Sequence, residues 1–382
     1  MVHLSDDNLF YDKELKILEK ANRVRARTIK EKNLLDFASN DYLNIGSNKK
    51  ILKKTISYIE KQTFFSPKSS SLINGYHNIH KKLEKKLCKL NGFENGIIVG
   101  SGFLANIAMF ESLIRKGDLL IIDELYHASG IMSLKLCQGK TKKFSHNNDK
   151  QLQEIIQKNK KNFNRIIVAV EGIYSMSGDM ANKNIYHICN QNNCILIVDE
   201  AHSAGIIGEN LNGWFDFFNF QIKHNHIKMG TLSKTYGSYG AYILSSYKII
   251  KYLENRAKPI IYSTALSLFD TKYGLEAIKY IKKNKQKLKD SIKQRQKIVK
   301  DILNIDIDGL IIPISSTSNK EVLKLQQDIA NAGFDVGAIR QPTVLKPILR
   351  VIAKSQNIDY LKALLDTIVK LKVASKDRYD EE

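Results

Sequence analysis

The feature that most constrains the fold is a series of short apolar runs separated by helical stretches. The runs consist mainly of Ile, Leu, Val and Ala and lie at residues 96–100, 119–123, 165–171, 194–198, 226–229 and 240–244. A strand with one solvated face alternates apolar and polar residues, whereas these runs are apolar on both faces. The sequence therefore predicts an α/β chain with a mostly parallel sheet and helices on both sides.

The length of 382 residues exceeds one average domain, and a hydrophobic share of 43% suffices for a core. We expect an N-terminal helix and arm over residues 1–45, a large domain over 46–265, and a linker helix with a smaller α+β domain over 266–382. The elements expected at the two ends are helices at 12–32, 319–332 and 357–372, a helical stretch running to about 304, strands near 309–314 and 348–352, and a polar, frayed tail from 376.

The formal net charge is +21, which would permit binding to nucleic acid or to an acidic surface. The lysines are spread along the whole chain and rarely alternate with aromatic residues, so a solvated basic surface is favoured, with steering of anionic substrates as an alternative. No apolar run approaches the roughly 20 residues that span a bilayer, and the first residues lack the pattern of a secretory signal. The four cysteines form no C-x-x-C pair, which favours a reducing cytoplasm over disulfides or a metal site.

Three chemically distinct side chains follow two of the predicted strands. Asp199 and His202 come at the end of the run ILIVDEAH, and Lys234 lies in the small-residue turn GTLSKTYG after the strand at 226–229. Open parallel sheets bind ligands beyond the carboxyl ends of their strands. A lysine amine that forms a Schiff base, an acid that keeps a pyridine nitrogen protonated and an imidazole beside the ring oxygen together suit pyridoxal 5'-phosphate (PLP).

Two of these residues also have a plainer interpretation. Asp199 could instead cap the N-terminus of a helix or belong to a structural ion pair. A carboxylate at the end of a buried strand, however, lowers stability unless it is paired. Lys234 is otherwise one surface lysine among 60 basic residues. The tight turn after a strand and the position downstream of Asp199 favour the catalytic interpretation.

Three further strand ends carry polar residues that suit the same cofactor. The turn VGSGFLAN at 99–106 places Gly102 and Phe103 at a helix N-terminus, where free N–H groups bind phosphate, and the Thr231 hydroxyl is a second phosphate donor. His127 follows another strand and suits stacking on a ring, and Ser175 suits a hydrogen bond to the ring oxygen or to substrate. Taken singly, each is equally typical of an ordinary turn or loop.

Together these motifs resemble the α-oxoamine synthases, which are PLP enzymes with the aspartate-aminotransferase-like fold (fold type I). The resemblance covers nearly the whole chain, from residue 36 to residue 344. The motifs that carry it are DFASNDYL at 36–43, SGF at 101–103, HAS at 127–129, EGIYSMSGD at 171–179, VDEAH at 198–202, Thr231 with Lys234, and IYSTA at 261–265. The segments 201–202 and 262–265 favour the branch of biotin biosynthesis.

The resemblance implies a role for each matching residue. Lys234 carries the cofactor and moves the proton at the substrate α-carbon, His127 stacks on the ring, Asp199 pairs with its nitrogen, and Ser175 and His202 reach its phenolic oxygen. Thr231, Gly102 and Phe103 hold the cofactor, and Thr264 reaches the phosphate of the neighbouring subunit in a homodimer. Arg350 binds the amino-acid carboxylate, and Arg23, with Arg25 as the alternative, meets the acyl substrate.

The implied reaction is the decarboxylative condensation of L-alanine with a pimeloyl thioester, on CoA or acyl-carrier protein, to 8-amino-7-oxononanoate. Two departures concern substrate selectivity: serine stands in the segment 67–75 where the family has arginine, and Ile352 stands where it often has a hydroxyl residue. Glycine with acetyl-CoA, or another acyl chain, is therefore the alternative within the family. A non-catalytic protein of the same fold that binds a partner or nucleic acid is the alternative outside it.

Overall fold

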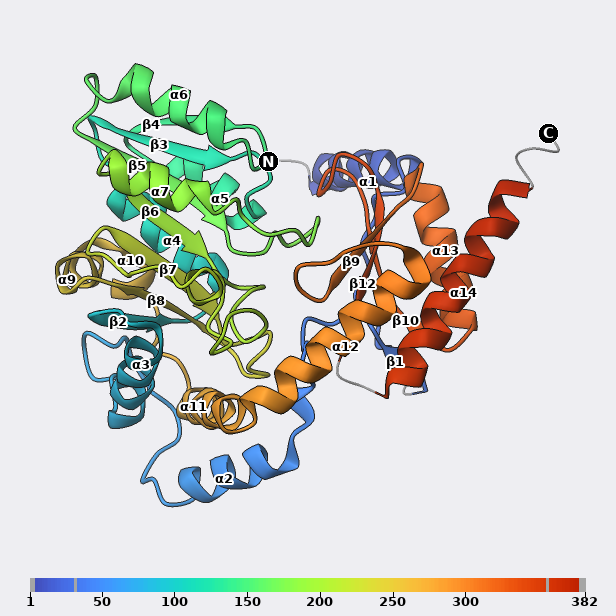
Figure 1. Ribbon diagram of the computed structural model, residues 1–382, viewed down its shortest axis with the longest axis horizontal. Coiled ribbons are helices and arrows are strands. Elements are labelled where there is room, and N and C mark those ends of the chain that lie inside the picture. The colour runs from blue at the N-terminus through green and yellow to red at the C-terminus, as the bar shows by residue number, and fades with distance from the viewer. Residues whose placement is uncertain (1–3, 31–32, 355–356, 378–382) are drawn as a thin grey trace. The chain divides into compact units, whose positions relative to one another are not determined.

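A computed structural model describes residues 4–30, 33–354 and 357–377. The chain forms two compact units (Figure 1). The larger unit contains Asn40–Gln296 and Ile307–Leu310, and the smaller one contains Met1–Ser39, Lys297–Asp306 and Ile311–Glu382. No helix within the described ranges is both long enough and apolar enough to cross a membrane.

The larger unit is built on a seven-stranded sheet with the order β2-β8-β7-β6-β5-β3-β4. Only β8 runs antiparallel to its two neighbours, so the sheet is mostly parallel and mixed, as predicted. The strands are β2 (Asn95–Val99), β3 (Asp118–Asp123), β4 (Lys140–Phe144), β5 (Arg165–Glu171), β6 (Ile195–Asp199), β7 (His226–Thr231) and β8 (Ala241–Ser245).

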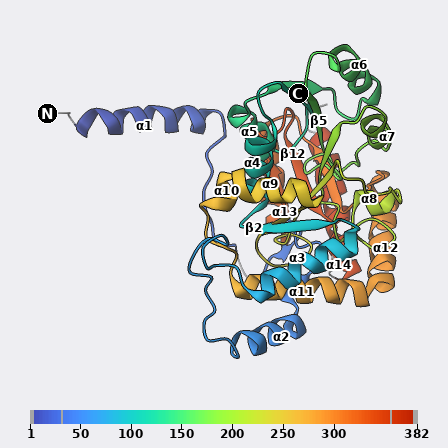
Figure 2. The same cartoon turned by 90° about the vertical axis from the view of Figure 1, so that its left-hand side faces the viewer.

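Helices cover both faces of this sheet, which explains why its strands are apolar on both sides (Figure 2). One face packs against α4 (Gly102–Leu113), α5 (Ala128–Ser133), α9 (Tyr247–Arg256) and α10 (Lys258–Ile261). The other face carries α6 (Asp149–Asn159), α7 (Asn184–Gln191) and α8 (Trp214–Phe217). The remaining elements of the unit are α2 (Lys49–Ile59), α3 (Asn78–Asn91), α11 (Leu268–Lys283), most of α12 (Lys285–Leu303) and the 3-10 turns at Ile45–Ser47 and Leu134–Leu136.

The smaller unit is an α+β arrangement. Strand β12 (Ile348–Ile352) pairs antiparallel with β9 (Ile311–Ser315) and with β11 (Gly337–Ile339). Strand β1 (Leu35–Asp36) pairs in parallel with β10 (Phe334–Asp335), which ties the N-terminal segment to the C-terminal part of the chain. Its helices are α1 (Leu4–Lys20), the end of α12, α13 (Asn319–Asn331) and α14 (Ile358–Asp377).

Two predicted helices differ from the structure. The helix expected over 12–32 is wrong beyond Lys20, because α1 ends there and Asn22 takes a positive φ of 52°. The helical stretch expected to run to about 304 is two helices, since Asn284 ends α11 with non-helical backbone angles. The frayed tail was expected from 376, and residues 378–382 lie outside the described part of the chain.

The two compact units divide the chain differently from the predicted domain boundaries at residues 45 and 265. The described residues up to Ser39 group with the C-terminal unit through the β1–β10 pair, and α11 groups with the larger unit because it packs on α2 and α3. The three-domain division itself stays a prediction.

Candidate active site

The candidate site lies at the carboxyl edge of the large sheet. Strands β5, β6 and β7 end there at Glu171, Asp199 and Thr231, and these three ends lie side by side because the strands are parallel neighbours. The turn with Lys234 follows β7 directly, and His202 comes three residues after the end of β6. The parallel topology thus brings together residues that are far apart in the sequence.

Asp199 is buried and accepts two hydrogen bonds. The Asn106 side-chain nitrogen donates to its Oδ2 at 3.1 Å, and the Ala201 backbone N–H donates to its Oδ1 at 3.0 Å. Asn106 comes from α4, and Tyr126 donates to its amide oxygen at 2.8 Å. These bonds fix the orientation of a carboxylate that would otherwise be costly at the end of a buried strand.

His127 is linked to Asp199 through a short hydrogen-bonded chain. The Ser129 hydroxyl accepts from the Asn106 amide at 2.9 Å and lies 2.7 Å from the His127 Nδ1. The Ser129 backbone N–H also donates to Nδ1 at 3.2 Å, so this nitrogen accepts and is unprotonated. Burial lowers the pKa of His127, and the nearby Lys234 lowers it further while Asp199 opposes this. The ring is therefore neutral at pH 7, which suits stacking on an aromatic ring.

Lys234 and His202 are in direct contact. The Lys234 Nζ lies 2.7 Å from the His202 Nε2, and the other ring nitrogen is hydrogen bonded to the Tyr42 hydroxyl. The turn that carries Lys234 is closed by a bond from the Gly237 N–H to the Lys234 carbonyl at 2.9 Å, with Gly237 at a positive φ of 57°. A Cβ at Gly237 would lie 2.3 Å from the Gly46 nitrogen, so only glycine fits this turn.

Glu171 is a second buried acid whose chemistry the sequence analysis did not identify. It is the register partner of Asp199, and its Oε2 accepts the Ser175 backbone N–H at 3.0 Å. Burial raises its pKa well above the usual range, Asp199 raises it further, and Lys234 acts in the opposite direction. The signal that could have revealed it is the one used for Asp199, an acid closing an apolar strand.

The expected phosphate-binding residues fit an anionic group. The buried Thr231 hydroxyl has no hydrogen-bond partner among the described residues, and an orphaned buried donor is costly unless a ligand satisfies it. Gly102 begins α4, and a Cβ there would lie 2.8 Å from the Thr231 methyl group, so the glycine keeps this corner open. Phe103 is exposed and supplies the next N–H group of the helix terminus.

The other predicted residues lie elsewhere in the two units. Ser175 is buried in the turn after β5, next to Glu171. Thr264 is exposed and forms an isolated antiparallel bridge with Ser70, which belongs to the serine-containing segment that departs from the family pattern. Arg350 is buried on β12 of the smaller unit.

Arg23 and Arg25 line one cavity of about 450 Å³ within the smaller unit. The Arg23 Nε is buried without a hydrogen-bond partner among the residues that the structure describes, and the Arg25 guanidinium Nη2 donates to the Thr343 hydroxyl at 3.0 Å. The cavity has both apolar and cationic walls, and its remaining lining residues are Leu15, Leu18, Val24, Arg340, Gln341 and Pro342.

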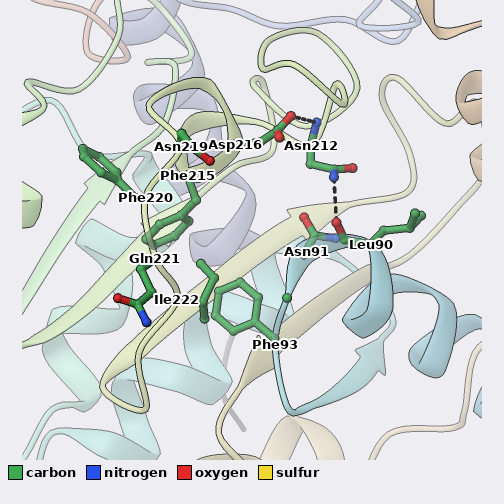
Figure 3. Close-up of a pocket in the computed structure, with 11 residues that line it drawn as sticks. Leu90, Asn91, Phe93, Asn212, Phe215, Asp216, Asn219, Phe220, Gln221 and Ile222 are labelled. Atoms are coloured by element: carbon green, nitrogen blue, oxygen red, sulfur yellow. Dashed lines mark hydrogen bonds between the residues drawn. The ribbon is translucent and has the colours of Figure 1, made fainter.

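A separate cavity of about 360 Å³ lies between the end of α3 and the segment after α8 (Figure 3). The Asn212 side chain donates to the Leu90 carbonyl at 2.7 Å across it, and none of the predicted site residues lines it. This cavity is therefore distinct from the sheet-edge site.

A lysine amine, an imidazole and a buried acid meet at the carboxyl edge of a mostly parallel sheet, beside a helix N-terminus and an unsatisfied hydroxyl. This arrangement defines a site of the kind that PLP-dependent enzymes use.

Comparison with known proteins points to the same class of enzyme. The profile of the aminotransferase class I and II family matches residues 32–368. The 8-amino-7-oxononanoate synthase of Helicobacter pylori is 41% identical over 94% of this chain and 96% of its own length.

Two solved structures extend the likeness. The 8-amino-7-oxononanoate synthase of Francisella tularensis is 25% identical, with a TM-score of 0.76 over 92% of this chain and 100% of that one. A serine palmitoyltransferase from S. paucimobilis shares the fold at 19% identity, with a TM-score of 0.84 over 96% of this chain and 98% of that one. The chain therefore belongs to the class I and II aminotransferase family and, within it, to the α-oxoamine synthases. The predicted fold and the predicted dependence on PLP are confirmed.

Proposed function

We propose that this enzyme condenses L-alanine with a pimeloyl thioester to form 8-amino-7-oxononanoate, the step that its 41% identical relative is named for. A bond forms between the alanine α-carbon and the acyl carbon, the thioester C–S bond breaks, and the thiol carrier leaves. The alanine carboxyl group is lost as carbon dioxide. The carrier is CoA or acyl-carrier protein, and the enzyme acts in biotin biosynthesis in the cytoplasm.

The observation that carries this proposal is the direct contact between the Lys234 amine and the His202 imidazole, at the sheet edge where β6 ends at Asp199. PLP, when bound, supplies an electron-poor ring that stabilises negative charge at the substrate α-carbon. Lys234 holds the cofactor, takes the α-proton of alanine and later returns a proton to that carbon. Asp199 keeps the ring nitrogen protonated, because opposite charges at close range favour each other.

The remaining predicted residues hold and orient the cofactor. The neutral His127 ring stacks on the pyridine ring, and His202 and Ser175 hydrogen bond to its phenolic oxygen. The Thr231 hydroxyl and the backbone N–H groups of Gly102 and Phe103 bind the phosphate. The orphaned hydroxyl of Thr231 and the open corner at Gly102 support this assignment.

Two arginine sites are proposed for the substrates. Arg350 pairs with the alanine carboxylate, for which the planar guanidinium is a suitable bidentate partner. Arg23 pairs with the terminal carboxylate of the pimeloyl chain, with Arg25 as the alternative. The cavity that both line supports this, because it combines apolar walls for methylene groups with cationic side chains for a carboxylate.

We also propose a homodimer in which Thr264 of one subunit contacts the cofactor phosphate in the other. The exposure of Thr264 supports this, since a residue that serves a second copy must be accessible in a single chain. Sedimentation of the holoenzyme together with the Thr264→Ala variant tests it. A dimer with weakened PLP binding in the variant is expected, and a fully active monomer would contradict it.

The decisive test of substrate identity is the mass of the product. The purified holoenzyme is incubated with L-alanine or glycine and with pimeloyl-CoA, pimeloyl-acyl-carrier protein or acetyl-CoA. We expect the mass of 8-amino-7-oxononanoate from alanine with a pimeloyl thioester. A product only from glycine and acetyl-CoA would replace this proposal with the alternative within the family.

A further inference from the structure

His146 lies between two carboxylates at the carboxyl edge of the sheet, just beyond β4. Its Nδ1 is 3.0 Å from an Asp123 oxygen, and its Nε2 is 2.7 Å from an Asp179 oxygen. Ionised carboxylates only accept hydrogen bonds, so both ring nitrogens donate and the imidazole is doubly protonated. None of the motifs in the sequence analysis includes this residue.

The next residue reinforces the same two contacts. The Asn147 backbone N–H donates to the other Asp123 oxygen at 3.0 Å, and its side-chain nitrogen donates to Asp179 at 2.9 Å and to the Met180 carbonyl at 3.0 Å. Asn147 takes a positive φ of 56°, which asparagine tolerates better than most residues. His146 and Asn147 thus form a two-residue clamp on Asp123 and Asp179.

The two aspartates belong to the segments that carry the proposed cofactor residues. Asp123 ends β3 and accepts the Leu125 N–H at 2.9 Å, at the start of the loop that leads to His127. The Asp179 carbonyl accepts the Tyr174 N–H at 2.9 Å, which closes the turn that contains Ser175. The clamp therefore fixes the separation between two segments that approach the proposed cofactor from different strands.

The titratable side chains that face His146 from the neighbouring elements are acidic or neutral. Burial lowers its pKa, but the hydrogen bonds and charges of Asp123 and Asp179 outweigh this and raise the pKa to about 10. The Glu124 carboxylate accepts the His146 backbone N–H at 2.9 Å, and Asp308 accepts the Met180 N–H at 2.8 Å. The Tyr174 ring meets the imidazole edge-on at 4.4 Å, and burial raises the tyrosine pKa, so its hydroxyl is neutral.

We infer that His146 is a positioning residue, a cationic clamp that sets the spacing between the His127 loop and the Ser175 turn and thereby the affinity for PLP. This inference rests on the proposed function, because that function assigns His127 and Ser175 to the cofactor. The geometry goes beyond ordinary stabilisation of the fold. The imidazole connects the loop that leads to His127 with the turn that contains Ser175, and it does so outside the core of the sheet.

The test compares His146→Gln with His146→Arg, which keeps a planar cation, and with the exposed His224→Gln as a control. Apo-protein is titrated with PLP, kcat and KM are measured, and the thermal unfolding of apo-protein is recorded separately. Misplacing a contact group by about 1 Å can cost on the order of 10²-fold, so we expect PLP affinity and kcat of His146→Gln to fall about tenfold or more. His146→Arg should recover most of this loss, and His224→Gln should match the wild type.

The pH dependence gives a second readout. A histidine whose pKa rises from 6.5 in the unfolded chain to about 10 in the folded one contributes fully below about pH 6.5 and loses its contribution as pH rises through about 10. The gap in PLP affinity between wild type and His146→Gln should therefore narrow between neutral pH and pH 10. A gap that stays constant over this range would overturn the ionic part of the inference.

A His146→Gln protein that unfolds at a lower temperature yet binds PLP and turns over like the wild type would overturn the inference, because the residue would then serve stability alone. If that variant does not fold, Asp179→Asn takes its place, with the same expected weakening of PLP binding and the same contrary outcome. Failure of the proposed function would look different, since the wild type itself would then neither bind PLP nor form product.

Discussion

Glu171 and Asp199 are register partners at the ends of the parallel strands β5 and β6, and both are buried. Burial raises the pKa of Glu171 well above its usual range and the nearby Asp199 raises it further, which favours the protonated form of Glu171. Asp199 is held by donors from Asn106 and Ala201 and remains available as the charged partner of a cationic ring nitrogen. The two neighbouring acids therefore differ in their surroundings, and only Asp199 is oriented by a side-chain donor from α4.

Because of this difference, we expect two conservative substitutions to change kcat/KM by very different amounts. Glu171→Gln replaces a protonated acid with an amide of the same shape, so kcat/KM should change less than about threefold. Asp199→Asn removes a charge that the reaction needs, and kcat/KM should fall about 10²-fold or more. Steady-state kinetics at pH 7 measure both variants, and a large loss for Glu171→Gln would show that Glu171 is ionised.

From the hydrogen bond between Tyr42 and His202 we expect a smaller effect on kcat/KM. Tyr42→Phe removes the hydroxyl that orients the ring in contact with Lys234. One hydrogen bond contributes about 1 kcal/mol, which corresponds to roughly a fivefold drop in kcat/KM. The exposed Tyr247→Phe serves as a control with no expected change. Equal kinetics for both variants would show that the Tyr42 hydroxyl does not contribute to catalysis by orienting His202.

A buried ion pair behind the site predicts a loss of stability. Lys228 and Glu200 are almost completely buried, with Nζ and Oε1 3.4 Å apart. Lys228→Met leaves the Glu200 charge without its cation, which should lower the free energy of unfolding by about 3–5 kcal/mol. The surface pair of Lys251 and Glu254 provides the control, since Lys251→Met should cost under about 0.5 kcal/mol. Urea unfolding measures both, and similar small losses would contradict the prediction.

We expect the neutral, buried His226 to make the folded protein less stable in acid. Its Nδ1 accepts the Lys223 N–H at 3.1 Å, and burial with the nearby Lys223 and His224 lowers its pKa to about 4. The folded pKa lies below the unfolded value of 6.5, so the contribution is complete above about pH 6.5 and is lost as pH falls through about 4.

The corresponding measurement is urea unfolding of wild type and His226→Gln between pH 4 and pH 8. The wild type should lose about 3 kcal/mol relative to the variant as the pH falls across this window, because each unit of pKa shift corresponds to about 1.4 kcal/mol. A difference in unfolding free energy that does not vary with pH would contradict the assignment.

The sequence was sufficient to predict most of the large sheet and the acid, imidazole and amine at its edge. Strands buried on both faces leave a clear apolar pattern, and parallel strands end at one edge, so Asp199, Lys234 and His202 could be predicted to converge. Strand β4 was not predicted, because four of its five residues are exposed and the apolar pattern is missing.

Other features depend on contacts between distant segments that no local pattern reveals. Tyr42 meets His202 across 160 positions, and His146 meets Asp179 across 33. The overlong helix at 12–32 has a related cause, since its lysine-rich composition favours a helix but does not show where the chain turns at Asn22.

The most direct test of the proposed mechanism is to identify the lysine that carries the cofactor. PLP is added to the purified protein, fixed to its lysine by borohydride reduction and located by mass spectrometry of the digested chain. We expect a single modified residue, Lys234, and a Lys234→Ala variant that takes up no label and forms no product. Label on another lysine, such as the buried Lys228 in the preceding strand, or turnover without Lys234, would contradict it.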